Sequence, residues 1–284
     1  MIGSARSGTT WLGDLLAAAL RARVVFEPFH PVHVAGMAPF GLMPYRSPED
    51  QDPAFLEFCR SVFSGALRGP WVDREANRIL PSGRVVKCVR ANLFTGWLGT
   101  WLPEVPVVVL VRHPASVVRS RMEAGWDAST DVDALLGNER LVRDHLADHV
   151  EWARSLSTEE ERNALIWAIH HRVTFRQRDP GNGAEVAFYE DVVADPAAVL
   201  AGVLDRLGRR APPLPERRLR RPSSTARRGR ATGTSAAAPG PRGLGEAALG
   251  RVLSVVERLD LDWVYGSGAR PTPAARERLG HARS

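Results

Sequence analysis

Short apolar runs alternate along the chain with longer segments of helical periodicity. Four runs, at 24–26, 84–89, 105–111 and 185–189, are apolar with little polar alternation. Runs of this kind are typical of parallel strands that are covered on both faces. Residues 1–3 are too few for a full strand, and we predict that they form the end of a first strand. The pattern therefore predicts about five parallel strands.

Segments with apolar residues three or four positions apart lie between these runs and predict helices. They cover 9–21, 53–67, 93–102, 115–124, 131–156, 158–178, 196–207 and 244–259. Since strand and helix alternate, we predict one three-layer α/β domain over residues 1–265 with a central parallel sheet. Residues 131–178 are predicted to form a helical insert, and 266–284 a flexible tail. Residues 28–52, rich in Pro and Gly, predict a long active-site loop.

Positive charge is concentrated in one segment. The chain has 284 residues and a formal net charge of +6, but residues 209–230 hold nine arginines and one glutamate, a local charge of +8 (9 − 1). The rest of the chain therefore carries about −2 (6 − 8). The Arg/Pro/Gly-rich stretch 209–243 fits either a solvated linker or a loop that closes over an anionic ligand. A nucleic-acid partner is not favoured, because no aromatic residues are interleaved with the arginines.

Composition narrows the class of protein further. No apolar run approaches the roughly 20 residues that a membrane span needs, and the first residues do not follow a signal-peptide pattern. The two cysteines, Cys59 and Cys88, have neither a disulfide framework nor metal-ligand spacing. We therefore expect a cytoplasmic protein without a membrane partner.

Residues 3–10, Gly-Ser-Ala-Arg-Ser-Gly-Thr-Thr, lie between the first strand and the first helix. They nearly match the phosphate-binding pattern G-x-x-x-x-G-K-[ST] and predict a P-loop NTPase-like fold, in which N–H groups at a helix N-terminus bind an anion. Thr9, however, stands where the lysine belongs. Arg112 follows the run at 105–111, where a nucleotidase usually carries a magnesium-binding Asp. We therefore predict an anion site of arginine and amides, without a metal.

The segment Arg6-Ser-Gly-Thr-Thr-Trp-Leu12 resembles the 5′-phosphosulfate loop of the sulfotransferases that use 3′-phosphoadenylyl sulfate (PAPS). The resemblance implies that this loop, with Arg6, Ser7, Gly8, Thr9 and Thr10, holds the 5′-phosphate and the sulfuryl group. It also implies that Trp11 lies near the adenine, although a tryptophan on a first helix is equally compatible with a core position.

PAPS also carries a 3′-phosphate, so a member of this family needs a second anion site. Arg112 and Ser120 fit the R-x7-S pattern that supplies this site in the family, although a capping arginine and a surface serine give the same pattern. Residues 188–196 resemble the family's Y-E-D-L-x-x-D-P segment, which implies that Tyr189 contacts the adenine. Residues 227–229, Arg-Arg-Gly, are a weak match to the R-K-G turn of the cytosolic branch.

Sulfuryl transfer to an alcohol needs a cation beside the bridging oxygen and a base for the hydroxyl proton. Lys87, the single lysine of the chain, resembles the strand lysine of the family and is assigned the first role, together with Arg6. The histidine that serves as base in the cytosolic branch is Val89 here. Glu27, before a proline as in the carbohydrate-sulfating branch, is the expected base, with His30 and His33 as alternatives.

The sequence thus predicts a metal-independent sulfotransferase that carries a sulfuryl group from PAPS to a hydroxyl of a saccharide or another small molecule. Two other functions remain open: a P-loop kinase or nucleotide-binding protein, and a sulfotransferase-like protein that binds nucleotide without turnover. Neither the acceptor nor the oligomeric state follows from the sequence.

Overall fold

The computed structural model describes residues 1–76, 81–178, 184–221 and 243–280. Its four strands are short and pair in parallel: β1 (Arg23–Phe26) with β2 (Arg84–Lys87), and β3 (Val107–Val111) with β4 (Ala184–Phe188). In register, Phe26 lies opposite Lys87, and Val111 lies opposite Phe188. The buried runs predicted from the sequence are therefore strands.

Residue Ile2 lies between the two pairs of strands. It forms parallel bridges with Cys88, next to β2, and with Val109 of β3. Its N–H donates to the carbonyl of Val108 at 2.7 Å, and its carbonyl accepts from the N–H of Leu110 at 2.8 Å. The described residues thus form two two-stranded sheets and a bridging residue, rather than the predicted sheet of about five strands, because residues 1–3 contribute only the isolated bridges of Ile2 and no strand of their own.

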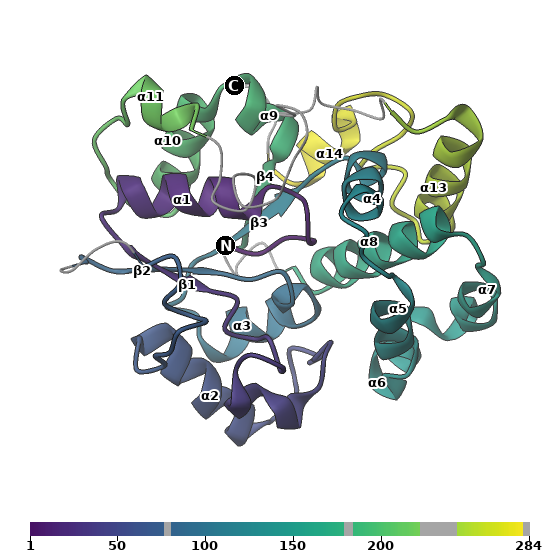
Figure 1. Cartoon of the computed structure of the whole chain (residues 1–284), viewed down its shortest axis with the longest axis horizontal. Helices are drawn as coiled ribbons and strands as arrows, with labels where there is room; N and C mark the ends of the chain where they lie inside the picture. Colours follow the sequence, from purple (N-terminus) through teal and green to yellow (C-terminus); the bar gives the residue numbers. More distant parts are fainter. Residues whose placement is uncertain (77–80, 179–183, 222–242, 281–284) are drawn as a thin grey trace.

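Helices cover both faces of the strands, as Figure 1 shows. The side chains of β3 alternate between two hydrophobic clusters: Val107, Val109 and Val111 belong to the larger one, whereas Val108 and Leu110 belong to the smaller one. This alternation follows from the two-residue period of a strand. The predicted three layers are therefore present.

The smaller cluster contains side chains of the first helix and of three helices from the later part of the chain. These are α1 (Thr9–Ala19), α9 (Tyr189–Ala194), α10 (Pro196–Arg206) and α11 (Glu216–Leu219). The start of α10 is fixed by Asp195, whose side chain accepts from the N–H of Ala198 at 2.9 Å, with proline in the first turn.

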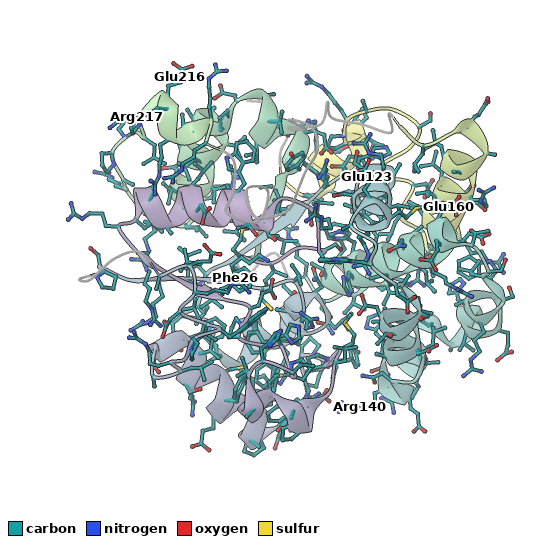
Figure 2. The ribbon with its side chains drawn as sticks, viewed as in Figure 1. Phe26, Glu123, Arg140, Glu160, Glu216 and Arg217 are labelled. Carbon is teal, nitrogen blue, oxygen red and sulfur yellow. The ribbon has the colours of Figure 1, made fainter. Side chains whose placement is uncertain are left out.

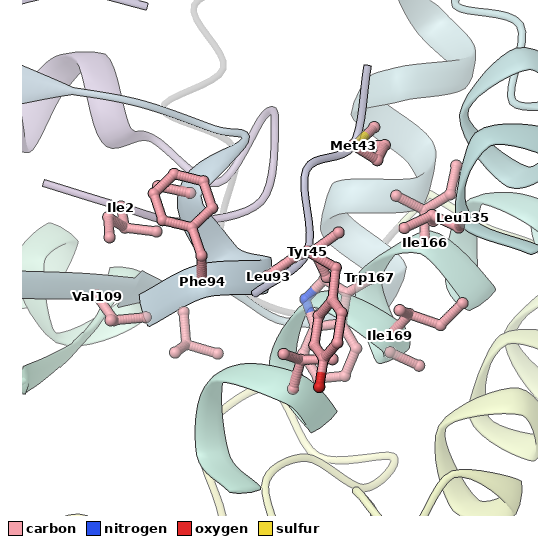
Figure 3. Close-up of a cluster of buried hydrophobic side chains, with 14 of the residues drawn as sticks. Ile2, Met43, Tyr45, Leu93, Phe94, Val109, Leu135, Ile166, Trp167 and Ile169 are labelled. Carbon is pink, nitrogen blue, oxygen red and sulfur yellow. The ribbon is translucent and has the colours of Figure 1, made fainter. Parts of the chain in front are cut away.

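The larger cluster holds most of the buried aromatic side chains. It contacts η1 (Ala35–Phe40), α2 (Pro53–Ser64), η2 (Ala91–Phe94), α3 (Thr95–Trp101), α4 (Pro114–Glu123), α8 (Glu159–Arg176) and α13 (Glu246–Arg258). Figure 3 shows Tyr45 of the loop after β1 between Leu93 and the α8 residues Ile166, Trp167 and Ile169. The predicted loop 28–52 is therefore packed into the core at Tyr45, which is 2 % exposed.

The predicted long helix at 131–156 is broken into short pieces. They are α5 (Ser129–Leu136), α6 (Glu139–Leu141), the π-helical turn η3 (Val142–Leu146), η4 (Ala147–His149) and α7 (Val150–Ser155). The first break falls at Gly137-Asn138, where the Asn138 side chain accepts from the N–H of Leu141 and starts a new helix. The predicted helical segment is therefore helical, but it is divided into separate helices instead of forming one.

The segment predicted as a flexible tail contains α14 (Pro273–Arg278), which is packed on the domain. Ala275 is fully buried, and both terminal nitrogens of Arg276 donate to the carboxylate of Asp191 at 2.8 Å. The prediction of a loose tail is therefore not met over these residues, because one apolar side and one bidentate ion pair hold the helix. Residues 281–284 lie outside the described part, as do 222–242 with the Arg-Arg-Gly match at 227–229.

Candidate active site

The loop at residues 3–8 connects Ile2 to α1 and has the conformation of an anion-binding turn. Gly8 caps α1 with a φ of 95°, and no side chain caps this end of the helix. A Cβ at Gly8 would lie 2.6 Å from Cδ2 and Cε2 of Tyr189, so the ring of Tyr189 lies directly against the glycine. The first N–H groups of a helix have no intrahelical partners. The N-terminus of α1 is therefore available to an anion.

Hydrogen bonds from the inner side of the molecule hold this loop in place. Both the N–H and the hydroxyl of Ser7 donate to the carbonyl of Ser4, the former at 3.1 Å. The hydroxyl of Ser4 lies 3.3 Å from Nδ1 of His170 and 3.4 Å from Nε2 of His171 on α8. The side chain of Ser7 thus stabilises the conformation of the loop. The loop also contacts α8 through Ser4 and the two histidines.

Arginine side chains from two distant segments meet beside the loop. Nε of Arg6 donates to Oγ of Ser120 on α4 at 3.1 Å, and Arg112 donates to the carbonyl of Arg6 at 3.0 Å. Burial, followed by the charge of Arg112, lowers the pKa of Arg6. Among the described residues Nε of Arg112 is buried without a partner. The three residues predicted to bind the two phosphates are therefore brought together. No described carboxylate forms an ion pair with Arg6 or Arg112.

The predicted adenine-binding residues also lie side by side. The rings of Trp11 and Tyr189 meet edge to face, with 6.2 Å between their centroids. Cζ of Arg112 lies 4.2 Å from the ring centre of Tyr189, a cation–π contact. Nε1 of Trp11 donates to the carbonyl of Leu219 at 3.2 Å. Leu219 lies near the end of the part of the Arg-rich segment that the structure describes.

Glu27 and Lys87 form a buried ion pair at the ends of β1 and β2. Nζ of Lys87 donates to Oε1 of Glu27, and the N–H of Val89 donates to Oε2 at 3.1 Å. The side chains of Lys87 and Glu27 are only 7 % and 5 % exposed. Glu27 has a φ of 43°, a left-handed conformation that is costly for a residue with a side chain. Such a conformation marks a candidate functional residue, since the surrounding hydrogen bonds must hold it in place.

The alternative bases differ in how they are placed. His33 is exposed and stacks on Trp71, with 3.6 Å between the ring centres. His30 is half-buried, and burial, followed by the charge of Arg90, lowers its pKa to about 4. His30 is therefore neutral near pH 7. Nδ1 of His30 is buried without a hydrogen-bond partner.

Glu27, Lys87, Arg112 and Tyr189 lie at the carboxyl ends of parallel strands. Glu27 follows Phe26, Arg112 follows Val111, Tyr189 follows Phe188, and Lys87 ends β2. Phe26, labelled in Figure 2, marks this edge in the middle of the molecule, and Glu123, three residues after Ser120, marks α4. Ligands of open α/β folds bind at this edge of a parallel sheet.

Glu190, His113 and Tyr265 also position this edge of the sheet, although the sequence patterns did not predict a role for them. Buried Glu190 accepts from the N–H of His113 at 3.0 Å and from the hydroxyl of Tyr265 at 2.6 Å, and burial raises its pKa. His113 caps α4 through Nδ1, which accepts from the N–H of Ala115 at 3.2 Å. Only the Y-E-D segment signalled Glu190, and nothing in the sequence signalled its partner Tyr265.

The described site thus combines a helix N-terminus without a side-chain cap and two arginines, Arg6 and Arg112, that form no ion pair with a described carboxylate. A family model described as the sulfotransferase family matches residues 1–213, about three quarters of the chain. The protein belongs to the sulfotransferase family, and the resemblance seen in the sequence is confirmed at that level. No curated protein and no solved structure matches the chain.

No helix of the described residues has the length and apolar character needed to cross a bilayer. The same residues contain no group of three or more His, Cys, Asp or Glu side chains that could hold a metal ion.

Proposed function

We propose that the protein transfers a sulfuryl group from PAPS to a hydroxyl of a saccharide or another small molecule, by in-line displacement. The main support for this proposal is the hydrogen bond between Arg6 and Ser120, together with the one from Arg112 to Arg6. These bonds bring the loop assigned to the 5′-phosphate next to the residues assigned to the 3′-phosphate. Family membership implies sulfuryl transfer in general, and the donor and acceptor are inferred here from the site.

Donor binding is assigned to two anion subsites. Arg6 and the N–H groups at the start of α1 bind the 5′-phosphate and the sulfuryl group, with the hydroxyls of Thr9 and Thr10 beside them. Arg112 and Ser120 bind the 3′-phosphate. Trp11 and Tyr189, which contact each other, receive the adenine.

The transfer step is assigned to Glu27 and Lys87. PAPS supplies an activated sulfuryl group, and the acceptor oxygen forms a bond to sulfur as the bond from sulfur to the bridging phosphate oxygen breaks. Glu27 accepts the proton of the acceptor hydroxyl, and Lys87 and Arg6 stabilise the charge that develops on the leaving adenosine 3′,5′-bisphosphate. The two donors to the carboxylate of Glu27 fix its orientation before the acceptor arrives.

The acceptor side is assigned to the loop 28–52 and the broken helical segment 129–155. These two segments are joined: the hydroxyl of Tyr45 donates to Asp144 at 2.9 Å, and Arg140 forms an ion pair with Asp50. Arg140 of α6 is labelled in the lower part of the molecule in Figure 2. Because the loop begins directly after Glu27, it is well placed to present a hydroxyl to that carboxylate. The cytoplasm remains our expected location, with Cys59 and Cys88 both free and buried.

A thermal-shift experiment with adenosine 3′,5′-bisphosphate (PAP), PAPS and MgATP tests the donor. We expect PAP and PAPS to raise the melting temperature at concentrations where MgATP does not. Incubation with ³⁵S-labelled PAPS and a panel of sugars and alcohols then tests transfer. A MgATP-specific shift contradicts the proposal in favour of a kinase, and donor binding without transfer to any acceptor favours the non-catalytic alternative.

A further inference from the structure

Tyr265 lies beyond residues 1–213, the part of the chain that the family model matches, yet it contacts the residues next to two donor motifs. Its hydroxyl donates to Oε2 of Glu190 at 2.6 Å, and Oε1 of the same carboxylate accepts from the N–H of His113 at 3.0 Å. Tyr265 is 0 % exposed and Glu190 is 2 % exposed, so water does not compete for these bonds. One buried carboxylate therefore joins the ends of β3 and β4 to the segment 259–280, named here the C-terminal segment.

The neighbours of this carboxylate along the chain are donor residues. Arg112, assigned to the 3′-phosphate, directly precedes His113, and Tyr189, assigned to the adenine, directly precedes Glu190. The carbonyl of Arg112 accepts from Nε1 of Trp167 on α8 at 3.0 Å. The backbone of Arg112 is thus held at its own carbonyl and, through the next N–H, by Glu190. The direction in which the guanidinium leaves β3 therefore depends on the bond that Glu190 forms.

Further contacts hold the C-terminal segment against these strand ends. Nε2 of His113 donates to the carbonyl of Gly266 at 3.2 Å, and the rings of His113 and Tyr265 meet edge to face, with 5.1 Å between their centroids. Both terminal nitrogens of Arg276 donate to the carboxylate of Asp191 at 2.8 Å. The segment is therefore bonded to the exits of both β3 and β4, and the hydroxyl of Tyr265 is its contact with the shared carboxylate.

We propose that Tyr265 is a positioning residue for the 3′-phosphate subsite and sets the preference for a nucleotide with a 3′-phosphate. Its hydroxyl holds the carboxylate of Glu190, and this carboxylate holds the N–H of His113 and so the turn that follows Arg112. Without the hydroxyl, Oε2 lacks its partner in a buried site, which is unfavourable for a carboxylate, so the carboxylate shifts and the turn loosens. The inference rests on the proposed function and adds the C-terminal segment to donor recognition.

The test compares two nucleotides that differ in the 3′-phosphate alone. PAP and adenosine 5′-monophosphate (5′-AMP) are titrated calorimetrically into the full-length wild-type protein and into Tyr265→Phe. We expect Tyr265→Phe to weaken PAP binding at least about fivefold and 5′-AMP binding less than about twofold, because the lost hydrogen bond supports the 3′-phosphate subsite only. The ratio of the two affinities therefore falls.

Tyr45→Phe is the matched control. Tyr45 is 2 % exposed, and its hydroxyl donates to the carboxylate of Asp144 at 2.9 Å, so this variant also loses one hydroxyl and one hydrogen bond to a carboxylate. Tyr45 is assigned to the acceptor side, and the control concerns nucleotide binding alone. Both variants should melt at a lower temperature than the wild type, but Tyr45→Phe should keep the wild-type ratio of PAP to 5′-AMP affinity.

A measurement on the wild type needs no variant to fold. Ligand binding slows amide exchange in the structure that it stabilises. At equal saturation, PAP should therefore slow hydrogen–deuterium exchange of residues 259–268 more than 5′-AMP does. Equal exchange of these residues with the two nucleotides would contradict the inference.

The outcomes separate the inference from the proposed function. If the wild type binds PAP no more tightly than 5′-AMP, the proposed 3′-phosphate subsite fails, and the inference fails with it. If the wild type prefers PAP and Tyr265→Phe keeps that preference within about twofold, the inference is overturned and the proposed function stands. An equal loss for both nucleotides, or an equal fall of the ratio in Tyr45→Phe, would show a general structural role and would also overturn the inference.

Discussion

Arg6 and Ser120 are 114 positions apart in the chain, yet Nε of the first donates to Oγ of the second at 3.1 Å. The bond joins the loop before α1 to the second turn of α4. Arg112 completes the group by donating to the carbonyl of Arg6 at 3.0 Å. In the function proposed here, these two parts of the chain, which are far apart in sequence, bind the two ends of one donor.

The first prediction concerns the 3′-phosphate. Ser120→Ala should weaken PAP binding about fivefold, because one net hydrogen bond contributes about 1 kcal/mol. Arg112→Ala should weaken it about 30- to 150-fold, since a charge-assisted pair contributes roughly 2–3 kcal/mol. Calorimetry with PAP and with 5′-AMP, which lacks the 3′-phosphate, measures both effects. Ser155→Ala, an exposed serine on α7, is the control, and an equal loss for 5′-AMP would argue against a 3′-phosphate subsite.

The second prediction concerns the base. Glu27→Gln should reduce turnover at least about 100-fold, because general-base catalysis contributes roughly 10²–10⁴-fold. PAP affinity should stay within about twofold, since the amide keeps the shape of the side chain. Thermal melting must accompany the assay, because the substitution leaves buried Lys87 without its carboxylate. Glu257→Gln on the exposed side of α13 should change neither quantity, and unchanged turnover in Glu27→Gln would exclude Glu27 as the base.

The third prediction concerns the loop glycine. Gly8→Ala should weaken PAP binding and lower the melting temperature, because its Cβ would lie 2.6 Å from the ring of Tyr189 and its φ is 95°. We expect a loss of stability of about 1–3 kcal/mol, as for other overpacked sites. Gly250→Ala is a fitting control, since this helical glycine of α13 has open space around it and alanine favours a helix by about 1 kcal/mol. If both variants melt alike, the close approach of Tyr189 is not a constraint.

The fourth prediction concerns stability at low pH. Burial lowers the pKa of His113 from 6.5 to about 4, so the unfolded chain binds the proton first as pH falls. The stability contributed by neutral His113 is therefore complete above about pH 6.5 and is lost as the pH falls through about 4, by up to about 1.4 kcal/mol per pH unit. Protonation also removes the Nδ1 acceptor that caps α4.

Urea unfolding of wild type and His113→Asn at pH 7, 6 and 5 checks this sign. Asparagine retains a capping oxygen but does not titrate, so the variant should lose less free energy of unfolding between pH 7 and pH 5. His145, His170 and His171 also have lowered pKa values and contribute in the same direction in both proteins. A parallel pH dependence of the two proteins would contradict the role given to His113.

The predictions made from the sequence succeeded where the signal was local. The run at 105–111 became β3 because five adjacent apolar residues suit a strand buried on both faces. The prediction of one long helix was wrong at Gly137-Asn138, where a local break outweighs the periodicity on either side. The prediction of a flexible tail was wrong over α14 because Arg276 donates to Asp191, which is 85 positions away. The periodicity of the sequence does not indicate such a distant partner.

By itself, the sequence determined the strands, most of the helices, the loop that connects Ile2 to α1 and the family to which the chain belongs. Only the tertiary structure decided that Lys87 pairs with Glu27 and that Tyr265 donates to Glu190. The physical reason is range: hydrophobic period and turn chemistry act between near neighbours in the chain. The partner and protonation state of a buried charge depend on all the elements that exclude water from it.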